Sequence, residues 1–225
     1  MTTGKKAAIF LFGRPASGKG TQAKILSDKT GFYHFTTSRE GKEYINTHSD
    51  EQTKRQAELY KAGKLFLPEW TSRVVLEKTM EIIKTAKGII YDGTPRTLYE
   101  AKAVFPEIVK LLGKENVYVL LIDISAEEFK RRVEKRLICN RDSRHVYIRS
   151  DVFMPGTKCP EGDGTLEIRD LDQKEVLQMR TDEYAEKTVP AIKFIEGLHA
   201  IKSINGEQSI ENTNKDILKA LGLWQ

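Results

Sequence analysis

The most informative stretch of the sequence is a glycine-rich segment that ends in a lysine, residues 13–19 (GRPASGK). It follows an apolar run at residues 7–12 and precedes a segment with helical spacing. In a strand–loop–helix context, backbone N–H groups surround a phosphate, the helix N-terminus adds partial positive charge, and the lysine reaches the outer phosphates. The segment therefore predicts a phosphate-binding loop. Gly20 departs from the general motif, because Ser or Thr usually follows the lysine, and Thr21 comes one residue later.

The elements around this loop indicate a parallel α/β sheet. Apolar runs at residues 7–12, 88–91 and 117–124 end at turn signals, and each precedes a segment with helical spacing. Their continuous hydrophobicity is typical of strands that are buried on both faces. Residues 138–169 break this pattern and predict a small flap of short strands. The predicted helices cover residues 19–30, 38–48, 51–62, 68–84, 98–111, 125–137, 171–196 and 214–221.

Length, composition and charge exclude several classes of protein. The 225 residues, of which 39% are hydrophobic and 31% charged, indicate one enlarged globular domain rather than a disordered chain. The apolar runs are far shorter than the roughly 20 residues needed to cross a bilayer. Two cysteines fit a reducing compartment, so we expect a cytoplasmic protein. The net charge is +5, and a basic stretch at residues 130–149 suits polyanions, either nucleic acid or phosphorylated small molecules.

Together these features resemble the nucleoside monophosphate (NMP) kinases, and the adenylate kinase family most closely. The loop ends in residues 18–21 (GKGT) as in that family, and residues 91–97 (YDGTPRT) resemble its Asp-Gly-Phe-Pro-Arg segment. Further similar segments follow in the family's order, at residues 62–65 (AGKL), 132–136, 169–190 and 205–206. The resemblance implies one P-loop domain, with a parallel sheet flanked by helices (residues 1–35, 68–137 and 169–225). It also implies a helical NMP-binding insert at 36–67 and a lid at 138–168.

The resemblance implies reversible transfer of the γ-phosphoryl group of ATP to AMP, which gives two ADP, by a monomer that uses Mg²⁺. No membrane or nucleic-acid partner is expected. An NMP attacks with an oxygen that is already ionised, so no carboxylate base is required. The site must instead supply positive charge, and guanidinium groups bind phosphate through two hydrogen bonds and keep their charge. The residues implied to be catalytic are Lys19, Arg96, Arg136, Arg169 and Arg180.

The same resemblance implies two nucleotide sites. The ATP-binding residues would be Gly13, Pro15, Ala16, Ser17, Gly18, Lys19, Gly20, Thr21, Arg132, Arg136 and Gln208. The NMP-binding residues would be Thr37, Arg39, Lys42, Lys64, Leu65, Phe66, Gly93, Arg96, Glu100, Arg169 and Arg180. Asp92, at the end of a buried strand, would hold Mg²⁺ through water, because magnesium keeps most of its hydration shell. Its alternative role is to cap the turn before Gly93.

The acceptor side departs from the family pattern. Arg39 replaces an aspartate, Lys42 replaces the arginine for the acceptor phosphate, and Thr94 replaces a phenylalanine. Arg39 precedes Lys42 by three residues on one helix face and could supply the missing guanidinium fork. Glu100 replaces the glutamine that reads adenine, and a carboxylate only accepts hydrogen bonds whereas guanine presents two donors. GMP, or a relaxed choice of acceptor base, is therefore the alternative to AMP, and a Glu100 without any base contact is a further one.

The flap carries a possible zinc site. Some family members hold zinc there with two Cys-x-x-Cys pairs, and this chain has Cys139 and Asp142, then Cys159 and Asp163, with His145 nearby. The two cysteines and the two aspartates could bind zinc tetrahedrally. The favoured alternative is a flap held by hydrogen bonds without metal.

Rival functions make different demands on the sequence. A P-loop kinase for a small metabolite would need a carboxylate base near the acceptor, and Glu40 and Glu100 are the candidates. A nucleotide sensor would have lost part of the arginine set, which this chain keeps. Nucleic-acid binding through the basic stretch is disfavoured because few aromatic residues there could stack on bases.

Overall fold

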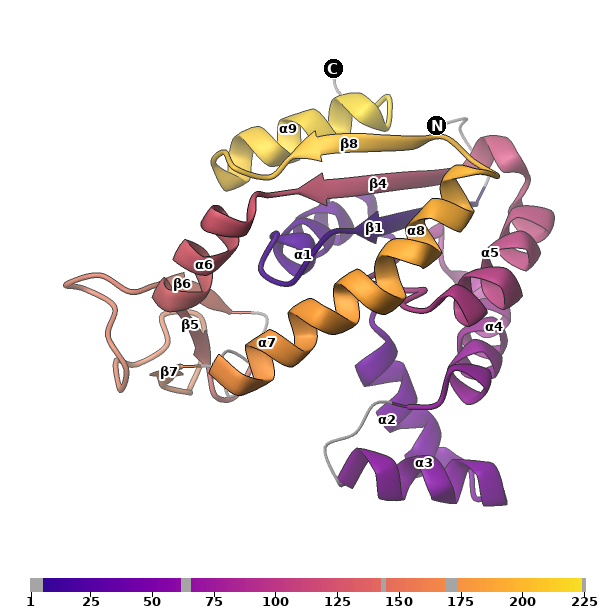
Figure 1. Ribbon diagram of the computed structural model, residues 1–225, viewed down its shortest axis with the longest axis horizontal. Coiled ribbons are helices and arrows are strands. Elements are labelled where there is room, and N and C mark those ends of the chain that lie inside the picture. The colour runs from indigo at the N-terminus through magenta and orange to yellow at the C-terminus, as the bar shows by residue number, and fades with distance from the viewer. Residues whose placement is uncertain (1–5, 62–65, 143–144, 169–173, 224–225) are drawn as a thin grey trace.

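A parallel β-sheet forms the centre of the protein. The computed structural model describes residues 6–61, 66–142, 145–168 and 174–223. Neighbouring strands pair in the order β2-β3-β1-β4-β8, and every pair is parallel (Figure 1). The strands are β1 (Ala7–Phe12), β2 (Tyr33–Phe35), β3 (Gly88–Asp92), β4 (Val117–Asp123) and β8 (Ile201–Asn205).

Helices cover both faces of this sheet because side chains of a strand alternate between faces. The even-numbered side chains of β1 pack in one apolar cluster with α4, α5 and α8, and the odd-numbered ones pack in another with α1 and α9. The helices in chain order are α1 (Lys19–Thr30), α2 (Thr37–Thr47), α3 (Glu51–Lys61), α4 (Pro68–Thr85), α5 (Leu98–Leu112), α6 (Ala126–Lys135), α7 (Lys174–Glu183), α8 (Val189–Glu196) and α9 (Ile210–Ala220).

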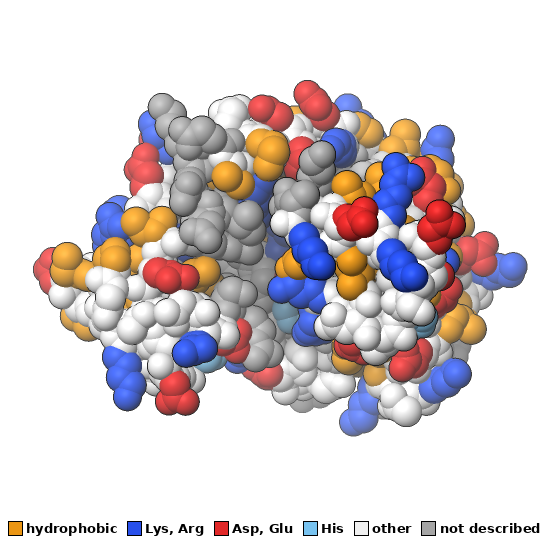
Figure 2. Space-filling model, turned by 90° about the horizontal axis from the view of Figure 1, so that it is seen from below, with side chains coloured by type: hydrophobic (Ala, Val, Ile, Leu, Met, Phe, Trp, Pro, Cys, Tyr) orange, Lys and Arg blue, Asp and Glu red, His pale blue; other side chains and the backbone are white. Residues whose placement is uncertain are grey.

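Two smaller units project from the core on the same side (Figure 1). One is the helical insert formed by α2 and α3. The other, here called the lid, contains an antiparallel sheet of β5 (Arg136–Cys139), β6 (Val146–Ile148) and β7 (Leu166–Glu167) in the order β6-β5-β7. Seen from below, a hollow lies between the two units, and Lys and Arg side chains border it on the right (Figure 2). Among the described residues, no helix is long and apolar enough to span a membrane.

The structure confirms the predicted parallel α/β fold and corrects several element boundaries. The helix predicted at residues 125–137 ends at Lys135, because the chain then enters lid strand β5. The helix predicted at 171–196 is interrupted by a π-helical turn, Tyr184–Thr188. The last helix begins four residues earlier than predicted, after Ser209, whose side chain accepts a hydrogen bond from the Asn212 N–H. Strands β2 and β8 were not predicted.

Candidate active site

The phosphate-binding loop joins the end of β1 to the start of α1. Gly13 has φ 147°, and a Cβ there would lie 2.4 Å from the carbonyl oxygen of Ile122. Gly18, the N-cap of α1, has φ 96°, and no side chain caps the helix. Glycine adopts these positive φ values without strain. The sequence thus folds into a tight curve that leaves the N–H groups of the first helical turn without a capping side chain, as an anion site requires.

Ser17 lies inside this curve. Its side chain is buried, and its Oγ has no hydrogen-bond partner among the described residues. A buried hydroxyl without a partner is unfavourable and calls for a polar group from outside the chain. The loop thus curves around an unsatisfied polar position, and a Cβ on Gly13 would lie 2.6 Å from Ser17 Oγ.

Lys19 reaches back over the loop. Its Nζ donates to the carbonyl oxygens of Gly13, at 2.6 Å, and of Arg14, at 2.9 Å. Burial lowers the pKa of Lys19 to about 8, against the opposing charge of Asp92, and the positive charges of Arg96, Arg180 and Arg136 lower the pKa further. The ammonium group is thus buried among three arginines and one carboxylate, and a bound polyanion would stabilise its charged form.

Asp92 ends β3 beside the same loop, because the carboxyl ends of parallel strands meet at one edge of the sheet. Its Oδ2 lies 3.2 Å from Nε2 of His34 and 3.4 Å from the position that a Cβ on Gly20 would take. Burial opposes ionisation, but the hydrogen bond with His34 and the charge of Lys19 hold the pKa of Asp92 below its usual value. Gly20 thus leaves room for an ionised carboxylate next to the first turn of α1.

The predicted arginines converge on this edge from several elements. The charges of Arg96, Arg136 and Arg180, from the β3–α5 loop, β5 and α7, all act on Lys19. Arg132 braces the loop, because its Nη1 donates to the carbonyl oxygens of Ala16 and Ser17, both at 3.3 Å, and its Nη2 donates to that of Gly206. Arg169 lies outside the described residues.

Gln208 lies on the donor side, in the loop between β8 and α9. Its Nε2 donates to the Asn205 carbonyl oxygen at 3.0 Å and to Asp216 at 2.7 Å. The neighbouring Gly206 accepts from Arg132 and donates to the Asp123 carbonyl oxygen at 2.8 Å. These contacts place the loop that carries Gly206 and Gln208 against Arg132, the arginine that also bonds to the phosphate loop.

Glu100 is buried at the start of α5, with 5% of its surface exposed. Its Oε2 accepts a hydrogen bond from the backbone N–H of Arg96 at 2.8 Å, and it is also hydrogen-bonded to Thr97. In return, the Glu100 N–H donates to Thr97 Oγ1 at 3.2 Å. Burial raises the pKa of Glu100 in spite of these bonds. The carboxylate is thus engaged with the backbone around Arg96.

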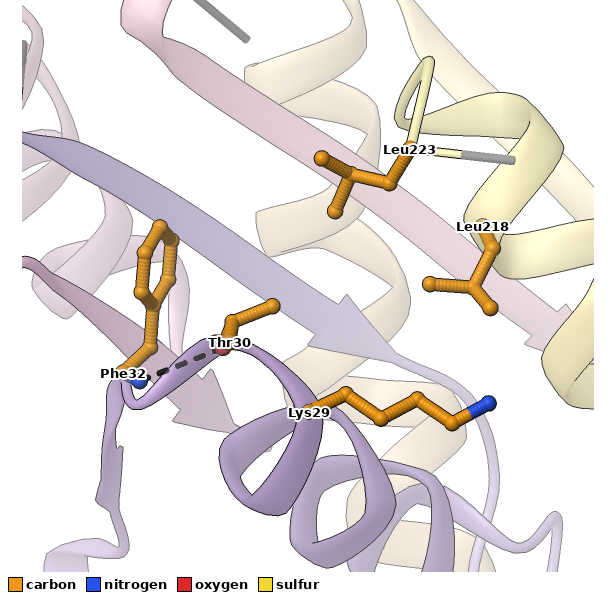
Figure 3. A pocket seen from close by; sticks show the side chains of 5 residues that line it. All are labelled: Lys29, Thr30, Phe32, Leu218 and Leu223. Atoms are coloured by element: carbon orange, nitrogen blue, oxygen red, sulfur yellow. Dashed lines mark hydrogen bonds between the residues drawn. The ribbon is translucent and has the colours of Figure 1, made fainter. Parts of the chain in front are cut away.

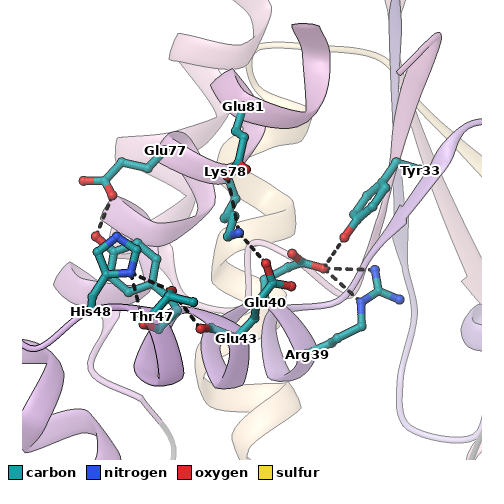
Figure 4. Close-up of polar contacts among 10 residues, drawn as sticks. Tyr33, Arg39, Glu40, Glu43, Thr47, His48, Glu77, Lys78 and Glu81 are labelled. Atoms are coloured by element: carbon teal, nitrogen blue, oxygen red, sulfur yellow. Dashed lines mark hydrogen bonds and ion pairs between the residues drawn. The ribbon is translucent and has the colours of Figure 1, made fainter. Parts of the chain in front are cut away.

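The predicted acceptor residues of the insert form two groups by their contacts. The first, Thr37 and Arg39, bonds to residues near β2 and the β3–α5 loop. Thr37 hydrogen-bonds Thr94, which ties α2 to the loop that carries Gly93 and Arg96. Arg39 turns to the side: Nε and Nη2 contact Oε1 of buried Glu40 at 3.0 Å and 2.9 Å, and Nη2 also donates to the His34 carbonyl oxygen (Figure 4). The hydroxyl of Tyr33 donates to the same Glu40 oxygen at 3.0 Å.

Lys42 and Phe66 form the second group. The Nζ of Lys42 lies 5.1 Å from the ring centre of Tyr60, and the Phe66 ring stacks on Tyr60 with centres 5.5 Å apart. A Cβ on Gly41 would lie 2.4 Å from Phe66, so the glycine allows the ring to pack against α2. Lys64 and Leu65 lie outside the described residues.

In the lid, three potential metal ligands lie together. Ligand atoms of Cys139, His145 and Cys159 all lie within 4.8 Å of one another, and Cys159 Sγ is 3.5 Å from Nδ1 of His145. Burial would raise the pKa of the Cys139 thiol, but hydrogen bonds, foremost from the backbone of Arg141, hold it below the usual value. Asp142 approaches the other imidazole nitrogen, with Oδ2 3.7 Å from Nε2. Asp163 is exposed and is not among the described residues that form this group.

The sequence analysis assigned no functional role to His34 or Thr188. No motif marks His34, which lies in a strand too short to show a pattern. Thr188 donates from its Oγ1 to the Arg96 carbonyl oxygen at 3.0 Å, across 92 residues of chain. For Glu100, the spacing of Thr97-x-x-Glu100 is that of a capping box and could have indicated its hydrogen bonds at the start of α5.

A pocket at the other end of α1 does not belong to this site. It is lined by Lys29, Thr30, Phe32, Leu218 and Leu223 (Figure 3). Residues 29 and 30 end α1, whereas the phosphate loop precedes its first residue, so the length of the helix, about 18 Å, separates the two.

Comparisons with known proteins agree with this geometry. The sequence pattern of the family described as adenylate kinase matches residues 11–199. The chain is 32% identical to an adenylate kinase of Thermosipho africanus over 95% of this chain and 98% of that protein. It is also 32% identical to an adenylate kinase of Methanothrix thermoacetophila, over 96% and 99% of the two chains. The chain belongs to the adenylate kinase family, the phosphotransferases that move a phosphoryl group between ATP and AMP.

Proposed function

We propose that this chain binds ATP at the phosphate loop and AMP between the insert and the β3–α5 loop, and transfers the γ-phosphoryl group directly between them. The observation that carries the proposal is the convergence of Arg96, Arg136 and Arg180 on the buried ammonium of Lys19. Such a ring of fixed positive charge matches the charge that spreads over a phosphoryl group during its transfer.

The acidic side chains near the acceptor support transfer to a phosphate rather than to a hydroxyl. A hydroxyl acceptor would need a carboxylate base. Glu40 accepts from Tyr33 and Arg39, and Glu100 accepts from the backbone of Arg96, so both candidates already have partners. A monophosphate oxygen needs no base, which fits this arrangement.

Each cationic residue has a proposed task. Lys19 and Arg136 hold the transferring phosphoryl group, Arg180 contacts both substrates, Arg96 holds the acceptor phosphate, and Arg132 keeps the loop in shape on the donor side. Lys19 must exchange its carbonyl partners, Gly13 and Arg14, for phosphate oxygens when ATP binds. The insert and the lid would then close over the hollow between them and exclude water, which otherwise could accept the phosphoryl group.

Asp92 is the proposed magnesium-binding residue. Its carboxylate is ionised and stands beside the first turn of α1, so it could hold the ion through water molecules. Bound Mg²⁺ would neutralise charge on the β- and γ-phosphates. Asp92→Asn should therefore raise the Mg²⁺ concentration needed for half-maximal activity, and an unchanged Mg²⁺ dependence would contradict this role.

AMP is the proposed acceptor. Glu100 stands where the family reads adenine, but its carboxylate bonds to Arg96 and Thr97, which argues against selection of guanine by this residue. The test is to incubate the purified protein with Mg·ATP and AMP, GMP, CMP or UMP, and to quantify the diphosphates formed. We expect the highest kcat/KM with AMP. A higher kcat/KM with GMP would establish the alternative.

For the lid, we propose a zinc ion bound by Cys139, Cys159 and Nδ1 of His145. Their ligand atoms lie within 4.8 Å of one another and could fill three of the four positions of a tetrahedral zinc ion, and the backbone hydrogen bonds to Cys139 favour a thiolate. Asp142 lies at the opposite imidazole nitrogen, so it would orient the histidine rather than bind metal in this arrangement. Zinc would join β5 to the following loop and thereby stiffen the lid.

The metal content of protein purified without chelator tests this site. We expect about one zinc per chain, a loss of zinc in His145→Ala, and normal zinc in the matched variant Asp163→Ala. Less than about half an equivalent in the wild type, or zinc retained by His145→Ala, would favour a flap held by hydrogen bonds.

A further inference from the structure

The peptide groups on both sides of the Arg96 Cα are held by two side chains, one four residues away at the start of α5 and one 92 residues away. Glu100 Oε2 accepts from the Arg96 N–H at 2.8 Å, and Thr188 Oγ1 donates to the Arg96 carbonyl oxygen at 3.0 Å. The guanidinium Nε donates to the Gly93 carbonyl oxygen at 3.1 Å. Neither Nη nitrogen of Arg96 has a hydrogen-bond partner among the described residues, so the outer end of the side chain is available to a phosphate.

The Thr188 hydroxyl bonds to a distant part of the chain, as Thr37 and Thr79 do, and not back along its own helix, as Thr30 and Thr181 do. Thr30 and Thr181 donate to the carbonyl oxygen four residues earlier, at 2.6 Å and 2.9 Å. Such back-bonding is the usual arrangement for threonine in a helix. Thr188 ends the π-helical turn Tyr184–Thr188, and its hydroxyl crosses to the β3–α5 loop instead. Single π-helical turns often occur at functional sites.

Glu100 also hydrogen-bonds to the β3–α5 loop. As the third residue of α5 after the cap Thr97, it would usually bond back to the N–H of the cap residue. Here its carboxylate also accepts from Arg96, one residue further back, and it is buried with these partners. A carboxylate engaged in this way fixes the direction in which Arg96 leaves the backbone.

We propose that Glu100 and Thr188 are positioning residues that hold Arg96 ready for the acceptor phosphate, and that Glu100 does not read the acceptor base. The inference rests on the proposed role of Arg96. Because Thr188 stands between α7 and α8, it also links the helix that carries Arg180 to the loop that carries Arg96. This link would hold Arg96 and Arg180 at fixed positions relative to each other.

Steady-state kinetics of four variants test the proposal. Thr188→Val removes the hydroxyl at nearly constant volume, and Thr188→Ser keeps it. Glu100→Met removes the acceptor, and Glu100→Gln keeps an oxygen that accepts from the Arg96 N–H. We expect the KM for AMP to rise about 3- to 10-fold in Thr188→Val and Glu100→Met, the range for one lost hydrogen bond. The KM for ATP should stay within about twofold of the wild type in all four.

The conservative variants and a matched control separate positioning from general damage. Thr188→Ser and Glu100→Gln should keep the wild-type KM for AMP, and Glu100→Gln should keep the ratio of kcat/KM for AMP to that for GMP. Thr181→Val, which removes a hydroxyl that bonds within its own helix, should change neither KM. In an Arg96→Ala background, Thr188→Val should have no further effect on the KM for AMP, because both residues act through Arg96.

Three results would overturn the proposal in a wild-type enzyme that is active. These are an unchanged KM for AMP in Thr188→Val, a tenfold change of the AMP to GMP ratio in Glu100→Gln, or equal effects of Thr188→Val with and without Arg96. A wild-type protein that forms no diphosphate from any NMP would instead refute the proposed function. Circular dichroism and the KM for ATP identify a variant that is misfolded, and Thr188→Ser and Glu100→Gln then still test the inference.

Discussion

Proton uptake on ATP binding is the sharpest consequence of the burial of Lys19. Burial lowers the pKa of Lys19 from 10.5 to about 8 in the protein without ligand. A bound polyphosphate favours the charged ammonium and should raise the pKa of Lys19 well above the pH of the measurement. At pH 8.5 the free protein then carries only about a quarter of a proton on Lys19, and the complex carries nearly one. Binding should therefore take up about 0.7 protons at pH 8.5 and about 0.1 at pH 7.

The affinity for ATP follows from the same linkage. Lys19 has a lowered pKa in the free protein, so ATP binding is unaffected by this group below pH 8 and weakens as the pH rises above 8. Between pH 7 and pH 9 the affinity should fall about tenfold. Titration calorimetry with Mg·ATP and no acceptor, in two buffers of different ionisation enthalpy, measures the proton uptake directly.

A matched variant isolates the lysine. Lys19→Arg keeps the positive charge but cannot lose it near pH 8.5, so its proton uptake should be close to zero. Wild-type protein without proton uptake at pH 8.5, or Lys19→Arg with the wild-type uptake, would refute the reasoning.

Three further substitutions test the loop. Lys19→Met should lower kcat/KM at least about a thousandfold without loss of the fold, because it removes charge from the transferring group; intact transfer would show that the site is wrong. Gly13→Ala places a Cβ 2.4 Å from the Ile122 carbonyl oxygen at φ 147° and should lower Tm by about 5–10 °C in a thermal melt; an unchanged Tm would contradict the loop geometry. Gly20→Ser adds a hydroxyl beside Asp92 Oδ2, whereas the Cβ of Gly20→Ala would only touch this oxygen at 3.4 Å, so Gly20→Ser should change the Mg²⁺ requirement more than Gly20→Ala does; equal Mg²⁺ requirements would argue against the contact.

The sheet and its phosphate loop were predictable where a run of residues carries the signal. The apolar run of β1 and the glycines after it specify a buried strand and a tight curve. Strand β2 has three residues, too few for a pattern, and edge strand β8 exposes Lys202 and Ser203. The π-helical turn before Val189 divides a segment that the sequence predicts as one continuous helix. Such features depend on tertiary contacts, which a single sequence does not display.

The candidate site shows the same division. Lys19 and Asp92 follow strands, so their place at one edge of the sheet is a consequence of parallel pairing. The partners of individual side chains are different, because they depend on rotamers. Arg39 has the spacing to assist Lys42 but pairs with Glu40. The capping-box spacing before Glu100 was available in the sequence, whereas the contact of Thr188 with Arg96 joins residues that no local pattern relates.

The ring of positive charge is tested most directly by a crystal structure with a bisubstrate mimic, in which five phosphates join two adenosines. We expect Lys19, Arg96, Arg136 and Arg180 each to lie within hydrogen-bond distance of the polyphosphate bridge, with one adenosine beside Gly206 and the other beside Thr37. Guanidinium groups that point away from the bridge would contradict the account.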